Sequence, residues 1–145
     1  MLFWGDCDSI YNVLLEKVNE NVDVRLIYDD LGSLGYVDND FCLKLQKVGI
    51  KCYIFNPFYP ILSGIYNNRD HRKILVIDGH TAFTGGINLA DEYINKKERF
   101  GHWKDTAIMV KGEAVNSFTL MFLQMWNITE TRKENFGRYM YTGGY

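Results

Sequence analysis

Apolar residues along the first third of the chain change between a helical and a strand spacing. Residues 8–21 place apolar side chains every third or fourth position, which predicts an amphipathic helix. A second helix is expected over 41–48, ending at Gly49. Residues 22–30 alternate apolar and polar side chains and 50–55 form a short apolar run, so both segments predict strands. Helices that alternate with strands predict an α/β fold.

A second group of strands is expected around a tight turn. Residues 73–78 are nearly all apolar, which is typical of a strand buried on both faces. Asp78-Gly79 is a hairpin signal and leads into another short strand at 81–84. These two segments predict a β-hairpin.

The remainder of the pattern predicts one short helix, one strand and one long helix. The short helix is expected near 89–95, the strand over 105–112 and the long helix over 113–126. Residues 128–145 carry little pattern and are expected to form a loosely structured tail of a single domain that spans 1–145. The expected buried side of the long helix consists of Val115, Phe118, Phe122, Met125 and Trp126.

Composition narrows the class of protein. With 145 residues, 47% apolar content and two prolines, the chain is expected to fold as one globular domain. A net charge of −2 offers no general field for binding a polyanion. Three cysteines without metal-like spacing predict reduced thiols in the core, and no apolar stretch is long enough to predict a transmembrane segment in this chain.

Candidate chemistry gathers at the start of the strand expected over 73–78. His71 and Lys73 are two residues apart, so their side chains leave the same face of an extended chain while Arg72 points away. The glycine pair at 85–86 permits close approach of the backbone, and Asn88 can donate amide hydrogen bonds. Imidazole, ammonium and carboxamide groups aimed at one tetrahedral anion predict a phosphodiester site.

Asp78 is separated from this group by the strand itself. Seven residues at about 3.3 Å each place it roughly 23 Å from His71, on the opposite face. We therefore expect Asp78 to have a structural role in the turn, capping backbone amides. A different carboxylate must orient the imidazole.

The order of these residues carries a resemblance. His71-x-Lys73-x4-Asp78, followed by Gly85-Gly86-x-Asn88, is similar to the HKD motif of the phospholipase D superfamily. The surrounding string "NNRDHRKILVIDGHTAFTGGINLADEYIN" resembles the amino-terminal half of bacterial cardiolipin synthases, and the similarity runs from about residue 3 to about residue 127.

The resemblance implies roles for individual residues in a site without metal or cofactor. His71 would be the nucleophile or the general acid, and Asp105 the carboxylate that hydrogen-bonds a catalytic histidine. The substrate phosphate would be bound by Lys73, Gly86 and Asn88. Asp78 would match the motif aspartate, whose role is largely structural.

The resemblance also implies a fold, a reaction and partners. The expected fold is half of an α/β/α sandwich with a mixed, mostly parallel sheet. The expected reaction transfers a phosphatidyl group between two phosphatidylglycerol molecules through a phosphohistidine and releases glycerol. The partners would be this anionic phospholipid, a membrane surface on the cytoplasmic side, and a second HKD half in the same chain or in a homodimer, with no nucleic acid expected.

Only one complete motif is present. His102-x-Lys104 has the same spacing, but Met109 stands where the aspartate would be and no Gly-Gly-x-Asn follows. One histidine does not readily serve both sides of one phosphorus, so the chain is interpreted as half of a two-motif enzyme. The alternatives are a homodimeric single-motif phosphodiesterase or nuclease, which the acidic pI disfavours, and a non-catalytic remnant.

Several residues keep a second interpretation. Asp91 and Glu92 compete with Asp105 as the orienting carboxylate, although both also suit the first turn of a helix. His80 is expected to face solvent. The charged run 96–99 is either a solvated surface or a contact with anionic lipid, and the aromatic loop at 56–62 is either a lipid-facing lip or core.

Overall fold

The computed structural model describes residues 7–33, 37–57, 70–130 and 135–143. Contacts divide the chain into two compact units, the first formed by 1–71 and 89–104 and the second by 72–88 and 105–145. That the whole chain is a single domain stays a prediction. The elements are α1 (Cys7–Asn19), β1 (Arg25–Asp29), α2 (Asp30–Ser33), α3 (Phe41–Lys47), β2 (Lys51–Phe55), β3 (Ile74–Ile77), β4 (Thr81–Gly85), η1 (Asp91–Tyr93), β5 (Ala107–Lys111), α4 (Val115–Thr129) and η2 (Phe136–Tyr139).

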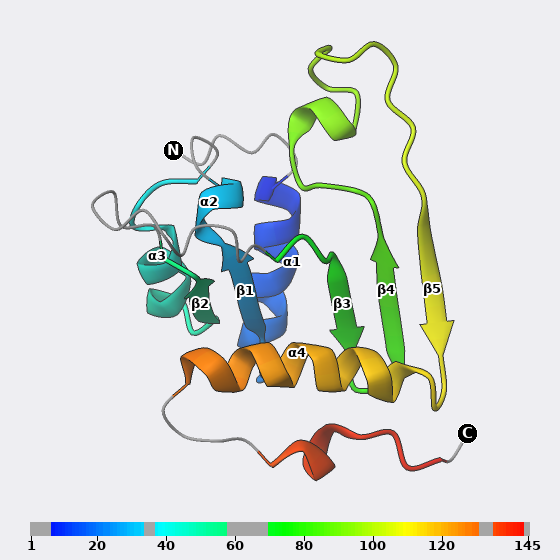
Figure 1. Ribbon diagram of the computed structural model, residues 1–145. Helices are drawn as coiled ribbons and strands as arrows, with labels where there is room; N and C mark the ends of the chain where they lie inside the picture. Colours follow the sequence, from blue (N-terminus) through cyan, green and yellow to red (C-terminus); the bar gives the residue numbers. More distant parts are fainter. Residues whose placement is uncertain (1–6, 34–36, 58–69, 131–134, 144–145) are drawn as a thin grey trace. The chain divides into compact units, whose positions relative to one another are not determined.

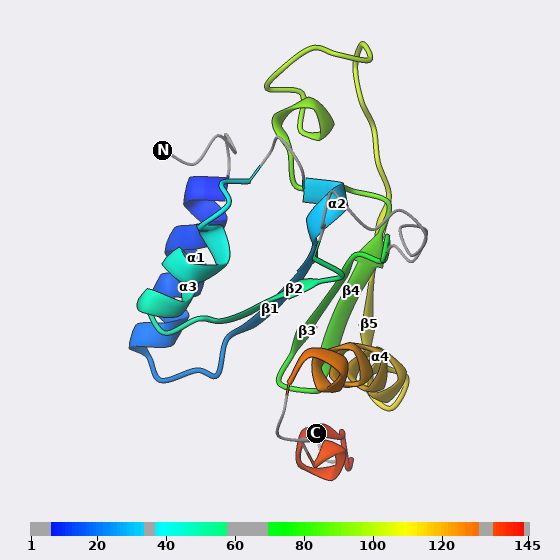
Figure 2. The same ribbon diagram turned by 60° about the vertical axis from the view of Figure 1, so that its left-hand side comes forward.

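The first unit is built on the parallel pair β1–β2, which α1 and α3 cover on one side (Figure 2). Leu26 is paired with Cys52, and Tyr28 with Ile54, so these four side chains share the face turned to the helices. Cys52 is 1% exposed and contributes to the core. Both Cys42 and Cys52 are unbridged and buried, which confirms the expected core thiols at these two positions.

Gly49 ends α3 as the sequence predicts. Its φ is 91°, a left-handed conformation that glycine adopts without strain. The amide of Ile50 donates to the carbonyl of Leu45 at 3.1 Å, and the amide of Gly49 donates to that of Gln46 at 3.1 Å. This pair of bonds is a Schellman motif, which turns the chain from α3 directly into β2.

The second unit is an antiparallel sheet in the order β3-β4-β5, with α4 packed against β3 and β4 (Figure 1). Asp78 and Gly79 have φ values of 52° and 63°, the sign that a type I′ hairpin turn requires at both central positions. The amide of His80 donates to the carbonyl of Ile77 at 3.0 Å and closes the turn. The predicted hairpin is therefore present, and its antiparallel pairing follows from the short connection.

The two faces of this sheet differ in burial. Val76, Ala82 and Val110 are paired across the strands, and Ala82 is fully buried, so this face is the one that α4 covers. On the other face Leu75 is 53% exposed and Met109 57% exposed. The prediction that the strand at 73–78 is buried on both faces was thus wrong, because Leu75 and Ile77 on this second face are largely exposed.

The long helix is found, but its buried side is displaced from the expected one. Val115, Thr119, Leu123 and Trp126 are buried, whereas Phe118, Phe122 and Met125 are only partly covered. Thr119 is accommodated because its hydroxyl donates to the carbonyl of Val115 at 3.1 Å. This internal hydrogen bond lets a polar residue occupy the stripe that apolar periodicity alone had assigned to phenylalanines.

The α/β class is confirmed, while strand pairing is more often antiparallel than expected. The described strands form one parallel pairing and two antiparallel pairings. The mostly parallel sheet implied by the resemblance would need a long crossover between successive strands. The turn at Asp78-Gly79 instead reverses the chain at once, and β5 returns beside β4 in the opposite direction.

The described part of the tail is attached to the second unit. Asn116 on α4 donates from Nδ2 to the carbonyl of Tyr141 at 3.1 Å and accepts from its amide at 2.7 Å. Residues 135–143 thus have a defined anchor, which the expectation of a loose tail over 128–145 did not include. No helix within the described ranges is long and apolar enough to cross a bilayer.

Candidate active site

Three predicted site residues lie at one end of the β3-β4-β5 sheet. Because the strands are antiparallel, β3 begins where β4 ends and β5 begins. Lys73 immediately precedes β3, Gly86 immediately follows β4, and Asp105 stands two residues before β5. The fold of the second unit therefore brings together three residues that are separated by up to 32 positions in the sequence.

The carboxylate of Asp105 lies directly against Gly86. A Cβ atom built on Gly86 would be 2.5 Å from Asp105 Oδ1 and 3.5 Å from Oδ2, so a side chain at this position would have to displace the carboxylate. The backbone fixes this approach, because the Gly86 amide donates to the carbonyl of Thr106 at 3.2 Å. The second glycine of the Gly-Gly pair thus makes room for the acidic residue.

This arrangement changes the interpretation of Gly86. The sequence suggested that its backbone would approach the substrate phosphate, but its N–H is already engaged by Thr106. Asp105 Oδ1 also accepts from the amide of Thr106 at 2.8 Å, which orients the carboxylate on the chain that enters β5. Gly86 is therefore a neighbour of the acid, and its phosphate contact stays a prediction.

Asp78 is at the opposite end of β3. Five residues of extended chain, about 16 Å, separate it from Lys73. Its side chain is exposed, and its φ of 52° is a conformation that aspartate adopts more readily than most residues. Asp78 contributes to the turn through its backbone conformation.

His71 belongs to the first unit and its side chain is exposed. The chain just before it is attached to β1, because the amide of Asp70 donates to Asp29 Oδ2 at 3.0 Å. Asp29 was not among the predicted site residues. Its place at the carboxyl end of a parallel strand, where ligands bind in open α/β sheets, was the signal available.

The structure gives fewer contacts for Asn88, the remaining residue of the predicted phosphate site. Asn88 is partly buried and follows Gly86 by two residues. That the imidazole of His71, the ammonium of Lys73 and the amide of Asn88 meet at one anion stays a prediction. The aromatic loop falls outside the described residues from position 58 onward.

The other histidine and carboxylate candidates have local partners. His80 is partly buried, with Nδ1 3.0 Å from the Thr81 hydroxyl and its ring 5.5 Å from that of Tyr141, so the expectation that it faces solvent was wrong. Glu92 is 6% exposed and accepts from Arg99 Nη1 at 3.1 Å. Asp91 begins the short helix η1, as a first-turn acid should.

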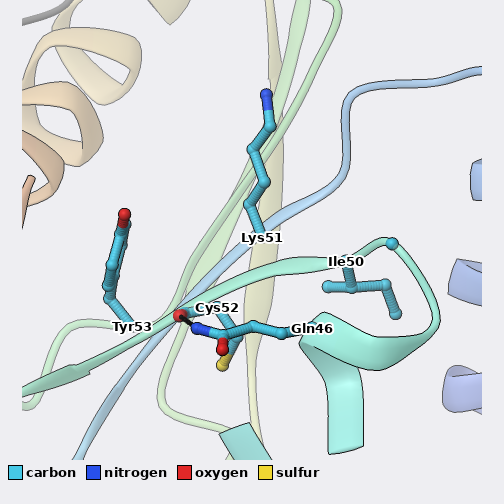
Figure 3. A pocket seen from close by; sticks show the side chains of 6 residues that line it. Gln46, Ile50, Lys51, Cys52 and Tyr53 are labelled. Atoms are coloured by element: carbon cyan, nitrogen blue, oxygen red, sulfur yellow. Dashed lines mark hydrogen bonds between the residues drawn. The ribbon is translucent and has the colours of Figure 1, made fainter. Parts of the chain in front are cut away.

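A depression in the first unit is separate from these residues. It has a volume of about 230 Å³ and is lined by Gln46, Gly49, Ile50, Lys51, Cys52 and Tyr53 (Figure 3). The amide of Gln46 donates to the carbonyl of Cys52 at 2.8 Å, and Lys51 is paired with Asp23 at 2.8 Å. None of the predicted site residues lines it. Over the described ranges, no group of three or more His, Cys, Asp or Glu side chains is placed to hold a metal ion.

Comparison with known proteins finds cardiolipin synthases among the relatives. The family profile described as "Cardiolipin synthase, PLD-like domain" matches residues 1–126. A cardiolipin synthase of Geobacillus thermodenitrificans is 45% identical over 119 residues, which are 81% of this chain and 24% of that protein. A cardiolipin synthase 2 of Staphylococcus epidermidis is 42% identical over 124 residues, 86% of this chain and 25% of that protein.

A further relative is more similar but has no named activity. An uncharacterized protein of Streptococcus mutans is 57% identical over 128 residues, 88% of this chain and 27% of that protein. The chain spans about a quarter of the length of the curated relatives it matches. The family profile covers most of the chain, including His71, Lys73, Asn88 and Asp105, so the chain belongs to the cardiolipin synthase family of phospholipase D-like domains.

Proposed function

We propose that this chain is one catalytic half of a phosphatidyltransferase of cardiolipin synthase type. The observation that supports it most is the juxtaposition of Asp105 with Gly86, next to Lys73, at one end of the sheet. An acid held at the glycine pair of the motif is what a histidine nucleophile needs in order to keep the correct tautomer. Membership in the family supports the same reaction class.

In the proposed first step, the imidazole of His71 attacks the phosphorus of a phosphatidylglycerol molecule. A nitrogen–phosphorus bond forms, and the bond between phosphorus and the glycerol oxygen breaks. The leaving alkoxide takes a proton from a histidine of the second half, and glycerol departs. Lys73 and Asn88 bind the non-bridging oxygens, whose negative charge grows in the transition state.

In the proposed second step, a second phosphatidylglycerol replaces glycerol. The histidine of the second half takes the proton from its hydroxyl, and the resulting oxygen attacks phosphorus. The bond to His71 breaks, and cardiolipin leaves with the phosphatidyl group. Asp105 orients the imidazole through both steps, and the charge of the phosphoryl group is stabilised by side chains without a metal ion.

The decisive experiment compares two substrates. Purified protein is incubated with phosphatidylglycerol in detergent micelles and, separately, with supercoiled plasmid DNA. The proposal predicts cardiolipin and glycerol in equal amounts and intact plasmid. Plasmid cleavage alone would replace it with the single-motif nuclease, and no turnover of either substrate when both catalytic halves are present would favour a non-catalytic remnant.

The histidine variant tests the mechanism. We expect His71→Asn to lower turnover by at least about a hundredfold, while the folded signal in circular dichroism is unchanged. Phosphatidylglycerol labelled at phosphorus should leave an acid-labile label on the wild-type protein and none on this variant. Activity that falls in EDTA and returns with a divalent cation would contradict the metal-free chemistry.

A further inference from the structure

The first unit contains a loop whose side chains are suited to binding a membrane surface. The segment 89–104, here called the 89–104 loop, consists of η1 and the open loop that follows it (Figure 1). It carries a small aromatic cluster: the rings of Tyr93 and Trp103 are 5.2 Å apart, and those of Phe100 and Trp103 are 5.5 Å apart. The loop therefore has apolar packing of its own.

Hydrogen bonds join the middle of this loop to its end. Asn95 Nδ2 donates to the carbonyl of Trp103 at 2.8 Å, and the amide of Trp103 donates to Asn95 Oδ1 at 2.6 Å. Asn95 has a φ of 60°, so the chain reverses at this clamp. Glu92, which is nearly fully buried, pairs with Arg99 across the loop at 3.1 Å.

The clamp presents apolar side chains to solvent. Phe100 is 52% exposed, Leu89 50% and Ile94 36%, within a segment of 16 residues. Phe100 has one side against Trp103 and the Arg99 guanidinium 5.0 Å from its ring centroid. Aromatic side chains fixed in this way, half packed and half exposed, suit the boundary between water and lipid.

The exposed charges of the 89–104 loop are mostly positive. Three lysines, Lys96, Lys97 and Lys104, are exposed, and so is Arg99, whose guanidinium is paired with the buried Glu92. Glu98 is exposed and Asp91 partly buried, so the exposed lysines outnumber the exposed acid three to one. This local excess contrasts with the net charge of −2 of the whole chain, and it is complementary to a negatively charged surface.

We infer that the 89–104 loop binds the surface of an anionic lipid bilayer, with Phe100, Ile94 and Leu89 entering the headgroup region and the basic side chains contacting lipid phosphates. The inference rests on the proposed function, because phosphatidylglycerol is an anionic lipid that must be taken from a membrane. Apolar burial and charge attraction act together at such a surface, and neither alone gives stable binding.

The exposed face of the β3-β4-β5 sheet is the rival surface. It presents Leu75, Ile77 and Met109, and its exposed basic residue within the strands is Lys111. Nothing in the described residues shows what covers this face. The 89–104 loop is preferred because apolar and basic side chains are both exposed on it, a combination that matches lipid headgroups above acyl chains.

The test measures binding of the purified protein to vesicles by co-sedimentation, with phosphatidylglycerol in one series and phosphatidylcholine in the other. We expect Phe100→Ser to weaken binding to phosphatidylglycerol vesicles about tenfold. The double variant Lys96→Ser/Lys97→Ser should weaken it about thirtyfold. Wild-type binding to phosphatidylcholine should be much weaker and should change little in the lysine variant.

Matched controls change the same residue types elsewhere. Leu43→Ser removes an apolar side chain that is 58% exposed on α3, and Lys47→Ser/Lys111→Ser removes two exposed lysines with the same change in net charge. Both should bind as wild type does. Thermal melts of every variant verify that the fold is retained.

The outcomes separate this inference from the proposed function. Unchanged vesicle binding by Phe100→Ser and by the lysine variant would overturn the inference, even if phosphatidylglycerol in micelles is turned over. Loss of binding in Leu75→Ser or Met109→Ser instead would assign the surface to the sheet. Dissociation of an oligomer by Phe100→Ser, seen by sedimentation velocity, would make the loop a protein interface. Vesicle binding that is sensitive to these variants, without turnover of phosphatidylglycerol, would support membrane binding by the 89–104 loop and contradict the proposed enzymatic function.

Discussion

Gly86 is a glycine because the side chain of Asp105 occupies the space beside it. The sequence motif contains the glycine pair and the acid as separate features, 19 positions apart. In the fold, the carboxylate of Asp105 occupies the volume that a Cβ on Gly86 would need. The φ of Gly86 lies outside the left-handed region, so steric room is the reason for glycine at this position.

This contact predicts an energetic coupling. Gly86→Ala should destabilise the protein by about 1–3 kcal/mol, the usual cost of overpacking, because the new methyl group displaces Asp105. In an Asp105→Ala background the same change should cost less than about 0.5 kcal/mol, since the obstructing carboxylate is gone. Urea unfolding of the four proteins in this double-mutant cycle measures the coupling.

Gly137→Ala provides the control for that cycle, because a Cβ there would be 3.3 Å from Asn135 Oδ1, a close contact that does not involve Asp105. Its cost should be the same with and without the Asp105 carboxylate. Equal costs of Gly86→Ala with and without the Asp105 carboxylate would contradict the steric explanation.

Asp23 gives a pH dependence. Partial burial raises its carboxyl pKa, but hydrogen bonds from Arg25 and Lys51 outweigh burial and lower the pKa below the ordinary value of 3.8. A folded-state pKa below the unfolded one means that these ion pairs stabilise the protein fully above about pH 4, and that the contribution disappears as pH falls through the folded-state value.

We therefore expect Asp23→Asn to remove part of the acid sensitivity. Between pH 6 and pH 2.5, wild type should lose about 0.5 kcal/mol more than the variant, the value of a solvent-screened ion pair. Unfolding midpoints in urea over this range provide the measurement. Glu98→Gln makes the same change in charge at an exposed site and should leave the wild-type profile in place, whereas identical profiles for wild type and Asp23→Asn would refute the assignment.

At the scale of elements, local sequence signals located most helices and strands. Which of their faces are buried depends on long-range pairing and packing. Apolar periodicity located α1 and α3, and Gly49 and Asp78-Gly79 marked a helix end and a turn because each needs a positive φ. The same periodicity could not show which face of β3 is covered, since burial depends on partners elsewhere in the chain. Thr119 in the buried stripe of α4 was likewise invisible, because a hydrogen bond within the helix satisfies it.

The candidate site shows the same contrast between local sequence signals and long-range pairing. Lys73 was predicted from its spacing to His71, and Asp105 from the resemblance to a known family, and the roles of both stay predictions. Both residues lie at one end of the sheet only because β3, β4 and β5 pair in an antiparallel register, which the sequence did not specify. Asp29 was missed because its hydrogen bond to the Asp70 amide joins residues 41 positions apart.

Attachment of the tail to α4 gives a prediction at this scale. Asn116 makes two hydrogen bonds with the backbone of Tyr141, so Asn116→Ala should release residues around Tyr141 and cost about 1–2 kcal/mol. Hydrogen exchange should then accelerate at the Tyr141 amide. Ser117→Ala, an exposed position one residue along the same helix, should leave that exchange rate unchanged. Equal exchange in wild type and Asn116→Ala would show that the anchor is not maintained in solution.

At the scale of the whole molecule, the central question is how one motif performs a two-histidine reaction. The chain matches about a quarter of its relatives' length and contains a single complete His-x-Lys-x4-Asp string. In-line displacement at phosphorus needs a nucleophile on one side and a proton donor on the other. Turnover by this chain on its own therefore predicts that two copies contribute one His71 each to a shared site, as a symmetric dimer allows.

Mixing wild type with His71→Asn at constant total protein tests this requirement. If two histidines serve one site, a mixed pair has lost one of them, so an equal mixture should retain about one quarter of the activity, the share of wild-type pairs under random exchange. Independent chains would retain about one half, because each would act without regard to its partner. Replacing the His71→Asn protein with Ser117→Ala should keep full activity and thereby exclude an effect of mixing itself. A linear decline with wild-type fraction would show that one imidazole suffices, and the proposed division of labour between two histidines would then be incorrect for this chain.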